Sequence, residues 1–199
     1  MNGVPIISSE FLLNAYCSGL FPMADGKQGE IHWFSPEVRG IIPLDGLKIS
    51  RSLRQTIRKK KFAVRINSNF EATIRACAER KDVWISETII QSYLQLHHLG
   101  YAHSVECWNN ETLVGGLYGV AIGGAFFGES MFSRLTDASK VALIFLVKRL
   151  IERGFVLLDT QYSNPHLLTL GCLEISRLEY MQRLQTAIHL DRHFMGDHQ

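Results

Sequence analysis

The sequence predicts an α+β fold in which helices flank a central, mainly antiparallel sheet. Three observations predict it. Strand-like segments at 103–108 and 112–122 are separated by Asn109-Asn110, a favourable hairpin turn. Residues 137–153 are strongly apolar at helical spacing, and Gly154 separates them from a buried strand at 155–158. The 199 residues, 46% hydrophobic and 20% charged, are enough to bury a substantial core.

The first 46 residues are predicted to form a small N-terminal subdomain. Ser8 or Ser9 can cap a short helix that ends near Gly19. Residues 21–46 then mix prolines and glycines with aromatic residues, a composition typical of turns rather than regular structure. The main domain is predicted to occupy residues 47–199.

The main domain is predicted to begin with a helix at 52–61, a strand at 62–67 and helices at 69–80 and 87–99. A strand at 125–128 extends the hairpin into a sheet. Asp137 or Ser139 is expected to cap the long apolar helix, and the strand at 155–158 follows it. Residues after about 190 are expected to be frayed.

Composition excludes several classes of protein. The N-terminus lacks a charged segment followed by an apolar run, and no apolar stretch approaches about 20 residues, so we expect neither secretion nor a membrane span. The four cysteines stand apart without metal-ligand spacing. They predict reduced, mostly buried thiols, no metal site and a cytoplasmic protein.

A basic segment at 48–65 is the first candidate functional feature. It holds eight of the 21 Lys and Arg residues and not a single acid. At helical spacing Arg51, Arg54 and Arg58 share a face, where they can contact successive nucleic-acid phosphates, and Lys59, Lys60 and Lys61 follow them. The alternative is a solvated basic helix without a partner.

Glu129 is the second candidate. It follows an apolar strand within the segment Gly-Glu-Ser-Met-Phe-Ser-Arg at 128–134. In a pocket, its carboxylate can hold a cationic group while Met131 and Phe132 line an apolar hole for a substrate side chain. The alternative is that Glu129 pairs with Arg134 and the two apolar residues belong to the core.

Asp159 and Gln161 are the third candidate. They emerge at the end of the predicted buried strand, and strand alternation puts them on one face. An Asp beside a Gln can orient an attacking amine and accept its proton. An Asp that only caps a loop is the alternative. His166 follows closely enough to be of interest, whereas Trp84 can be core or can stack on a nucleobase.

Other motifs are missing from the sequence. It has no Walker loop, no GxGxxG before a helix, no HExxH and no GxSxG. Residues 134–139, Arg-Leu-Thr-Asp-Ala-Ser, contain no glycine where an acyl-CoA-dependent acetyltransferase needs a phosphate-binding loop. That enzyme class is therefore a weak alternative, and a binding module that uses only the basic segment is the non-enzymatic one.

A set of ordered motifs resembles the leucyl/phenylalanyl-tRNA-protein transferases over nearly the whole chain. The resemblance rests on Tyr16 with Gly19-Leu20-Phe21-Pro22, Trp33-Phe34-Ser35-Pro36 with Arg39, Ile49-Ser50-Arg51-Ser52, Trp84-Ile85, residues 115–120, residues 127–134, Ala138-Ser139-Lys140, and residues 159–161 with His166 and Leu170-Gly171. Met23 and His32 depart from it, because tryptophan is usual at both positions.

This resemblance implies a C-terminal domain like the GNAT acyltransferases. It implies transfer of Leu or Phe, and less readily Met, from aminoacyl-tRNA to proteins that begin with Arg or Lys, which marks them for degradation. Such enzymes act as monomers, without a cofactor, metal, membrane or ATP at this step. The implied site comprises Asp159, Gln161 and Glu129 for catalysis, a pocket of Trp84, Phe127, Ser130, Met131 and Phe132, and a tRNA-binding surface of Arg51, Arg54, Arg58 and Lys59 to Lys61.

Overall fold

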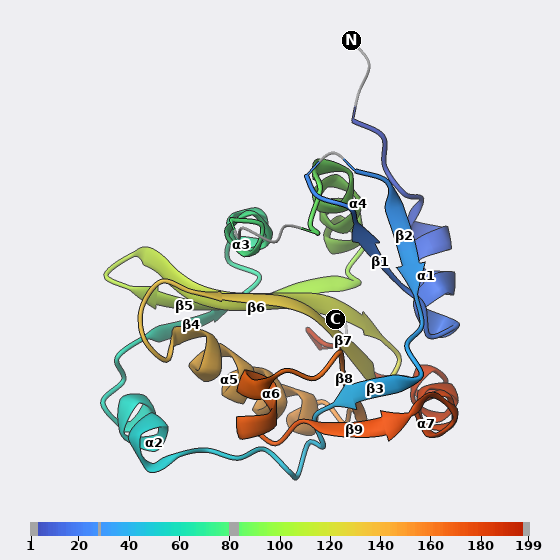
Figure 1. Cartoon of the computed structure of the whole chain (residues 1–199). Helices are drawn as coiled ribbons and strands as arrows, with labels where there is room; N and C mark the ends of the chain where they lie inside the picture. The colour runs from blue at the N-terminus through green and yellow to red at the C-terminus, as the bar shows by residue number, and fades with distance from the viewer. Residues whose placement is uncertain (1–3, 28, 80–83, 197–199) are drawn as a thin grey trace.

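The computed structural model describes residues 4–27, 29–79 and 84–196. It confirms the α+β class with a central, mainly antiparallel sheet (Figure 1). Seven strands lie in the order β4-β5-β6-β7-β8-β3-β9, and all neighbours are antiparallel except β7 and β8. The strands are β1 (Phe21–Ala24), β2 (Ile31–Phe34), β3 (Val38–Ile41), β4 (Ala63–Ile66), β5 (Ala102–Asn109), β6 (Thr112–Ile122), β7 (Ala125–Ser133), β8 (Leu157–Gln161) and β9 (Leu173–Ser176).

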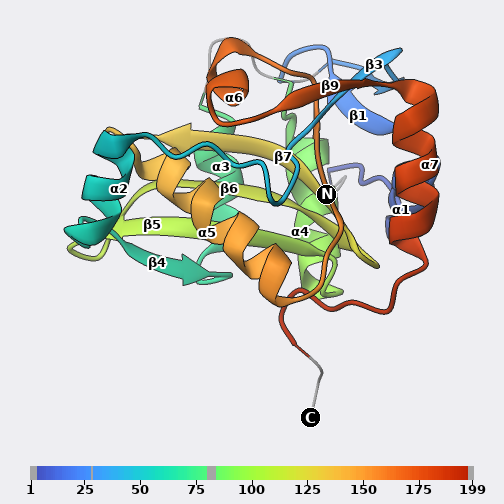
Figure 2. The same ribbon diagram turned by 90° about the horizontal axis from the view of Figure 1, so that it is seen from below.

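Helices cover both faces of this sheet. They are α1 (Ser9–Cys17), α2 (Arg51–Arg58), α3 (Phe70–Cys77), α4 (Glu87–His98), α5 (Ala138–Glu152), α6 (Pro165–Thr169) and α7 (Arg177–Ile188). In Figure 1, α3 and α4 lie above the sheet and α5 lies below it, while Figure 2 shows α5 crossing the strands. Two apolar cores result, one centred on α4 with Tyr93 and Leu96, the other on α5 with Leu143 and Val147.

The helix starts follow ordinary capping chemistry, with one exception. Ser50 and Ser86 accept hydrogen bonds from backbone N–H groups three residues on, at the starts of α2 and α4. Asp137 precedes α5 as predicted, but its side chain makes no capping bond and its φ is +74°. Its carboxylate instead accepts a hydrogen bond from Thr56 and pairs with Lys140. The predicted position of Asp137 is therefore confirmed, but the predicted capping hydrogen bond is wrong.

The prediction of turns without regular structure at 21–46 is wrong. Strands β1 and β2 form a small two-stranded sheet, and β3 joins the large sheet between β8 and β9. Each has only four residues, and Pro22 and Gly40 lie within β1 and β3, which weakens the strand signal. The division of the chain near residue 46 remains a proposal.

The C-terminal part also differs from the prediction. Strand β8 covers 157–161 rather than 155–158, and α6, β9 and α7 were not predicted. The segment beyond 190 is not frayed as far as residue 196. Phe194 is buried in the core of α5, where Arg149 and Arg153 donate hydrogen bonds to the carbonyls of Phe194 and His193.

None of the helices in the described part of the chain is long and apolar enough to cross a membrane. Cys77, Cys107 and Cys172 are buried, Cys17 is half-buried, and all four are free thiols, as predicted.

Candidate active site

A cavity of about 380 Å³ opens where β7 and β8 diverge. The two strands pair from Ala125 opposite Leu157 to Phe127 opposite Asp159, after which β7 continues alone to Ser133. Most of the cavity wall is apolar, and its polar groups come mainly from the middle of β7, the end of β8 and the start of α6. The lining residues are Phe21, Met23, Trp84, Leu117, Tyr118, Gly128, Glu129, Ser130, Met131, Leu143, Leu146, Leu158, Thr160, Gln161, Tyr162, Asn164, His166 and Leu167.

A β-bulge delivers Glu129 to this cavity. Tyr118 of β6 lies opposite Ser130, and the next residue, Gly119, lies opposite Gly128. Glu129 is therefore the extra residue on β7, without an opposite partner in the ladder. A bulge re-aims the inserted side chain, and such bulges are common beside active sites.

The Glu129 carboxyl is buried and held by two hydrogen bonds. Its Oε1 accepts one from the Tyr16 hydroxyl at 2.6 Å and one from Gln161 Nε2 at 2.8 Å, and the Tyr16 hydroxyl also meets that of Tyr93. Its Oε2 is buried without a hydrogen-bond partner among the described residues. Burial raises the pKa of Glu129 to about 7; the bond from Tyr16 opposes this rise, and the charge of Asp159 adds to it. Glu129 can therefore gain or lose a proton near neutral pH.

This raised pKa predicts a pH-dependent stability. The pKa is higher in the folded chain, about 7 against 4.5, so the contribution to stability is complete below pH 4.5 and is lost as the pH rises through 7. Relative to Glu129→Gln, the wild type should lose about 3 kcal/mol of unfolding free energy between pH 4.5 and 8. Urea unfolding of both proteins at several pH values measures this difference. A constant difference across that range would contradict the assigned pKa.

Asp159 has different surroundings. It is completely buried, and Arg39 donates a hydrogen bond to each carboxylate oxygen. Nε lies 2.9 Å from Oδ1 and Nη2 lies 2.7 Å from Oδ2. The Tyr180 hydroxyl donates to Oδ2 and the backbone N–H of Gln161 donates to Oδ1. Each oxygen therefore accepts two hydrogen bonds, and the carboxylate is saturated by protein groups.

Arg39 connects this carboxylate to the N-terminal part of the chain. The guanidinium is 1% exposed and donates to the Gly19 carbonyl at 3.1 Å. It also lies between the rings of Phe21 and Tyr180, 4.6 and 4.3 Å from their centroids. The ion pair thereby fixes β3, β8 and α7 around the end of β8.

The backbone of Gln161 departs from the predicted strand alternation. Its φ is +59°, a left-handed conformation that non-glycine residues rarely adopt. The hydrogen bond from its N–H to Asp159 Oδ1 accompanies this bend, and its amide side chain reaches Glu129. Asp159 thus contacts Arg39 and Tyr180, whereas Gln161 lines the cavity.

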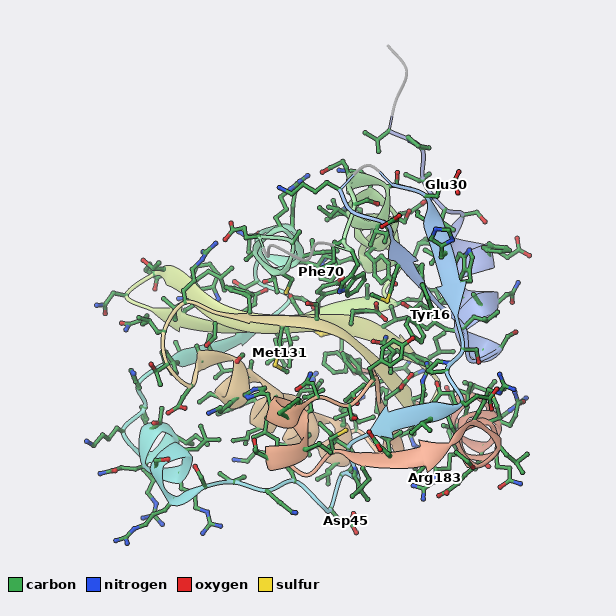
Figure 3. The ribbon with its side chains drawn as sticks, in the orientation of Figure 1. Tyr16, Glu30, Asp45, Phe70, Met131 and Arg183 are labelled. Atoms are coloured by element: carbon green, nitrogen blue, oxygen red, sulfur yellow. The ribbon has the colours of Figure 1, made fainter. Side chains whose placement is uncertain are left out.

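The predicted pocket residues divide into two groups. Trp84, Ser130 and Met131 line the cavity, and Figure 3 shows Met131 between the strands and the helices below them. Phe127 and Phe132 are buried in the core on the α4 side. The alternative pairing of Glu129 with Arg134 is also excluded, because Arg134 pairs with Glu79.

The predicted nucleic-acid surface lies on and after α2. All six of its predicted residues are exposed: Arg51, Arg54, Arg58, Lys59, Lys60 and Lys61. None of them takes part in an ion pair within the part of the chain that the structure describes. Figure 3 shows the nitrogen-tipped side chains around α2 directed away from the sheet. These charges are available to an anionic partner.

Sequence reasoning missed two tyrosines of the site and assigned no role to two further residues. Tyr93 and Tyr180 went unnoticed because buried aromatic residues carry no signal of function. Tyr16 and Arg39 belong to the family motifs but received no role. Arginine is almost never fully buried without a partner, but the burial of Arg39 and its place in β3 are visible only in the structure.

Family models match most of the chain and place it among the aminoacyltransferases. One model, described as leucyl/phenylalanyl-tRNA protein transferase, matches residues 41–185, and the model of that enzyme's N-terminal domain matches residues 6–37. The chain belongs to the leucyl/phenylalanyl-tRNA protein transferase family.

Curated relatives agree with this assignment. The chain is 54% identical to a leucyl/phenylalanyl-tRNA–protein transferase of Cereibacter sphaeroides over 92% of this chain and 86% of that protein. It is 53% identical to one of Rubrobacter xylanophilus, over 94% and 98% of the two chains, and 52% identical to one of Gloeobacter violaceus, over 92% and 95%.

Two solved structures share a weaker likeness. L-PGS from Bacillus licheniformis is 14% identical, with a TM-score of 0.43 over 81% of this chain and 53% of that one. A GCN5-related N-acetyltransferase-like protein from Streptococcus suis is 12% identical, with a TM-score of 0.40 over 84% and 64%.

Proposed function

We propose that this transferase moves Leu or Phe, and less readily Met, from aminoacyl-tRNA to the α-amino group of proteins that begin with Arg or Lys. The products would enter degradation through the N-degron pathway in the cytoplasm, and the enzyme would act as a monomer without a cofactor. One observation carries the chemistry. Glu129, whose carboxyl has a pKa of about 7 and an Oε2 without a hydrogen-bond partner among the described residues, lines an apolar cavity beside the Gln161 amide.

The reaction is the aminolysis of an ester, which needs a neutral amine, a proton acceptor and correct placement of both reactants. The amine nitrogen attacks the ester carbonyl carbon, and the C–N bond forms as the amine loses a proton. We assign that proton to the Glu129 carboxylate. The C–O bond to the ribose then breaks, and protonated Glu129 returns the proton to the departing ribose oxygen.

Gln161 would orient the amine. Its Nε2 is committed to Glu129, which leaves the amide oxygen as an acceptor for an amine N–H. Asp159 would act through Gln161, because its own oxygens are saturated by Arg39, Tyr180 and the Gln161 N–H. The proton acceptor proposed here is therefore Glu129, whereas the sequence analysis favoured Asp159.

The cavity wall supports an apolar donor side chain. Leu117, Leu143, Leu146, Leu158 and Met131 line it, and a volume of about 380 Å³ lies within the usual range for small-ligand sites. A leucyl or phenylalanyl side chain would replace water against these residues. Trp84, half-buried at the cavity, offers a ring on which the terminal adenine can stack. The negative charge of ionised Glu129 would attract the acceptor terminus in its cationic form, which must lose one proton to solvent before the neutral amine attacks.

Binding of the tRNA would rely on the exposed cations of α2. Replacing Arg51, Arg54 and Arg58 together by Ala should weaken tRNA binding and lower the slope of log K against log salt by about 2, because each lost phosphate contact removes about 0.7–0.9 of a released counterion. Filter binding between about 50 and 200 mM salt measures this slope, because affinities of this kind change strongly over that range. Arg183→Ala is the control, since Figure 3 shows Arg183 on α7, away from α2. An unchanged slope would exclude α2 from the tRNA surface.

A donor and acceptor panel tests the substrate assignment. Purified protein is mixed, without ATP, with tRNA carrying labelled Leu, Phe or Met and with peptides that differ only in the first residue. We expect label in peptides that begin with Arg or Lys and little in those that begin with Gly. Equal labelling of all peptides would contradict the acceptor rule. Binding of tRNA without any transfer would favour a binding module.

A further inference from the structure

The basic surface of α2 and the cavity are joined by two side chains that the family comparison leaves without a role, Lys140 and His166. Both belong to helices on the α5 side of the sheet. Figure 2 shows α2, the start of α5 and α6 on the same side of the molecule.

The first link runs from α2 to α5. The two helices pack together, and Thr56 of α2 donates a hydrogen bond of 3.0 Å to Asp137 Oδ2. On the other carboxylate oxygen of Asp137, Lys140 Nζ lies 3.5 Å away. The Lys140 ammonium therefore lies beside the contact between α2 and the first turn of α5.

The second link runs from α5 to the cavity. Leu143, one turn after Lys140 on α5, lines the same cavity as His166 of α6. In agreement, burial and then the positive charge of Lys140 lower the pKa of His166. His166 lines the cavity together with Asn164 and Leu167. A neutral imidazole keeps one N–H donor, so this side of the cavity offers a cation followed by a hydrogen-bond donor.

Lys140 has spare capacity to bind an anion. Its side chain is 35% exposed, and the contact with Asp137 is long for a charge-assisted hydrogen bond. The ammonium has three N–H groups, of which Asp137 takes one. The carboxylate of Asp137 is a charge that opposes an anion here, and it is turned toward Thr56 and Lys140.

We propose that Lys140, followed by His166, binds the phosphates of the single-stranded 3′ end of aminoacyl-tRNA as this end runs from α2 into the cavity. The inference rests on the proposed function and adds a segment to it. The stem would lie on the exposed cations of α2, the aminoacyl-adenosine in the cavity, and the phosphates between them on Lys140.

Three donors separate these segments. Leucyl-tRNA has both the acceptor stem and the phosphates of the 3′ end. A leucylated CCA trinucleotide has only the phosphates of the 3′ end, and leucyl-adenosine has no phosphate. Lys140→Ala should lower kcat/KM about tenfold with the first two donors, since a hydrogen bond to a charged group has roughly this effect. With leucyl-adenosine the change should stay below about twofold, and Lys140→Arg should retain most of the activity with all three donors.

The controls make the outcome specific. Lys148→Ala removes an exposed lysine two turns along the same helix and should match the wild type with every donor. The triple Ala variant of α2 should lose activity with leucyl-tRNA but not with the trinucleotide. An equal loss for Lys140→Ala with all three donors, or no loss with any, would overturn the inference.

Two other outcomes have separate meanings. The loss of activity in Lys140→Ala can also be measured with acceptor peptides that differ in their number of acidic residues. If this loss depends on those acidic residues and not on the donor phosphates, Lys140 binds the acceptor protein and the inference is wrong. If the wild type transfers leucine from none of the three donors, the proposed function itself fails. The donor series therefore distinguishes failure of the inference from failure of the function.

Discussion

Replacing Arg39 by Met should lower the free energy of unfolding by about 3–5 kcal/mol, because it leaves the completely buried Asp159 carboxylate without its counter-ion. The loss should be visible as a lower midpoint in urea unfolding. Activity should fall as well, since the end of β8 carries Gln161 into the cavity.

A double variant separates the buried charge from the lost packing. Arg39→Met with Asp159→Asn leaves no uncompensated charge, so it should recover much of the stability lost in the single variant. The matched control is Arg177→Met, which removes an exposed pair with Glu37 and should change stability by less than about 1 kcal/mol. A loss below about 1 kcal/mol in Arg39→Met would show that this ion pair does not fix the site.

Replacing Glu129 by Gln should reduce kcat roughly a hundredfold to a thousandfold with little change in tRNA affinity. The amide keeps the shape of the side chain but cannot accept the proton of the attacking amine. Stopped transfer reactions with saturating leucyl-tRNA measure kcat, and filter binding measures the tRNA affinity.

The matched control for this loss is Ser130→Ala, the next residue along β7 and also a lining residue. It removes a polar group from the same wall and should change kcat much less. Wild-type turnover in Glu129→Gln would contradict the role of Glu129, and a parallel loss of tRNA binding would indicate a damaged cavity instead.

The hairpin and the long helices could be predicted because their signals are local. The bounds 112–122 agree with β6, and α4 begins at the predicted Glu87, since a tight turn and a capping serine act within a few residues. The predicted turn Asn109-Asn110 is wrong by one residue, because Asn109 pairs with Thr112 and the turn is Asn110-Glu111, both at positive φ. The short strands β3 and β9 are different. Each is four residues long and depends on pairing with distant strands, so their stability is not encoded in their own composition.

The site was only partly predictable for the same reason. Glu129 and Gln161 could be singled out as polar residues at the ends of apolar strands. The bulge that turns Glu129 into the cavity depends on the register between β6 and β7, which neither strand reveals alone. The saturation of Asp159 depends on Arg39, 120 positions away in the sequence, and on Tyr180 of an unpredicted helix.

The most direct test of Glu129 as the proton acceptor follows labelled leucine from leucyl-tRNA into a peptide that begins with Arg, without ATP, for the wild type and Glu129→Gln in parallel. We expect rapid transfer by the wild type and transfer slowed at least a hundredfold by the variant. No transfer by the wild type from either leucyl-tRNA or phenylalanyl-tRNA at low salt, or equal rates for the two proteins, would contradict this expectation.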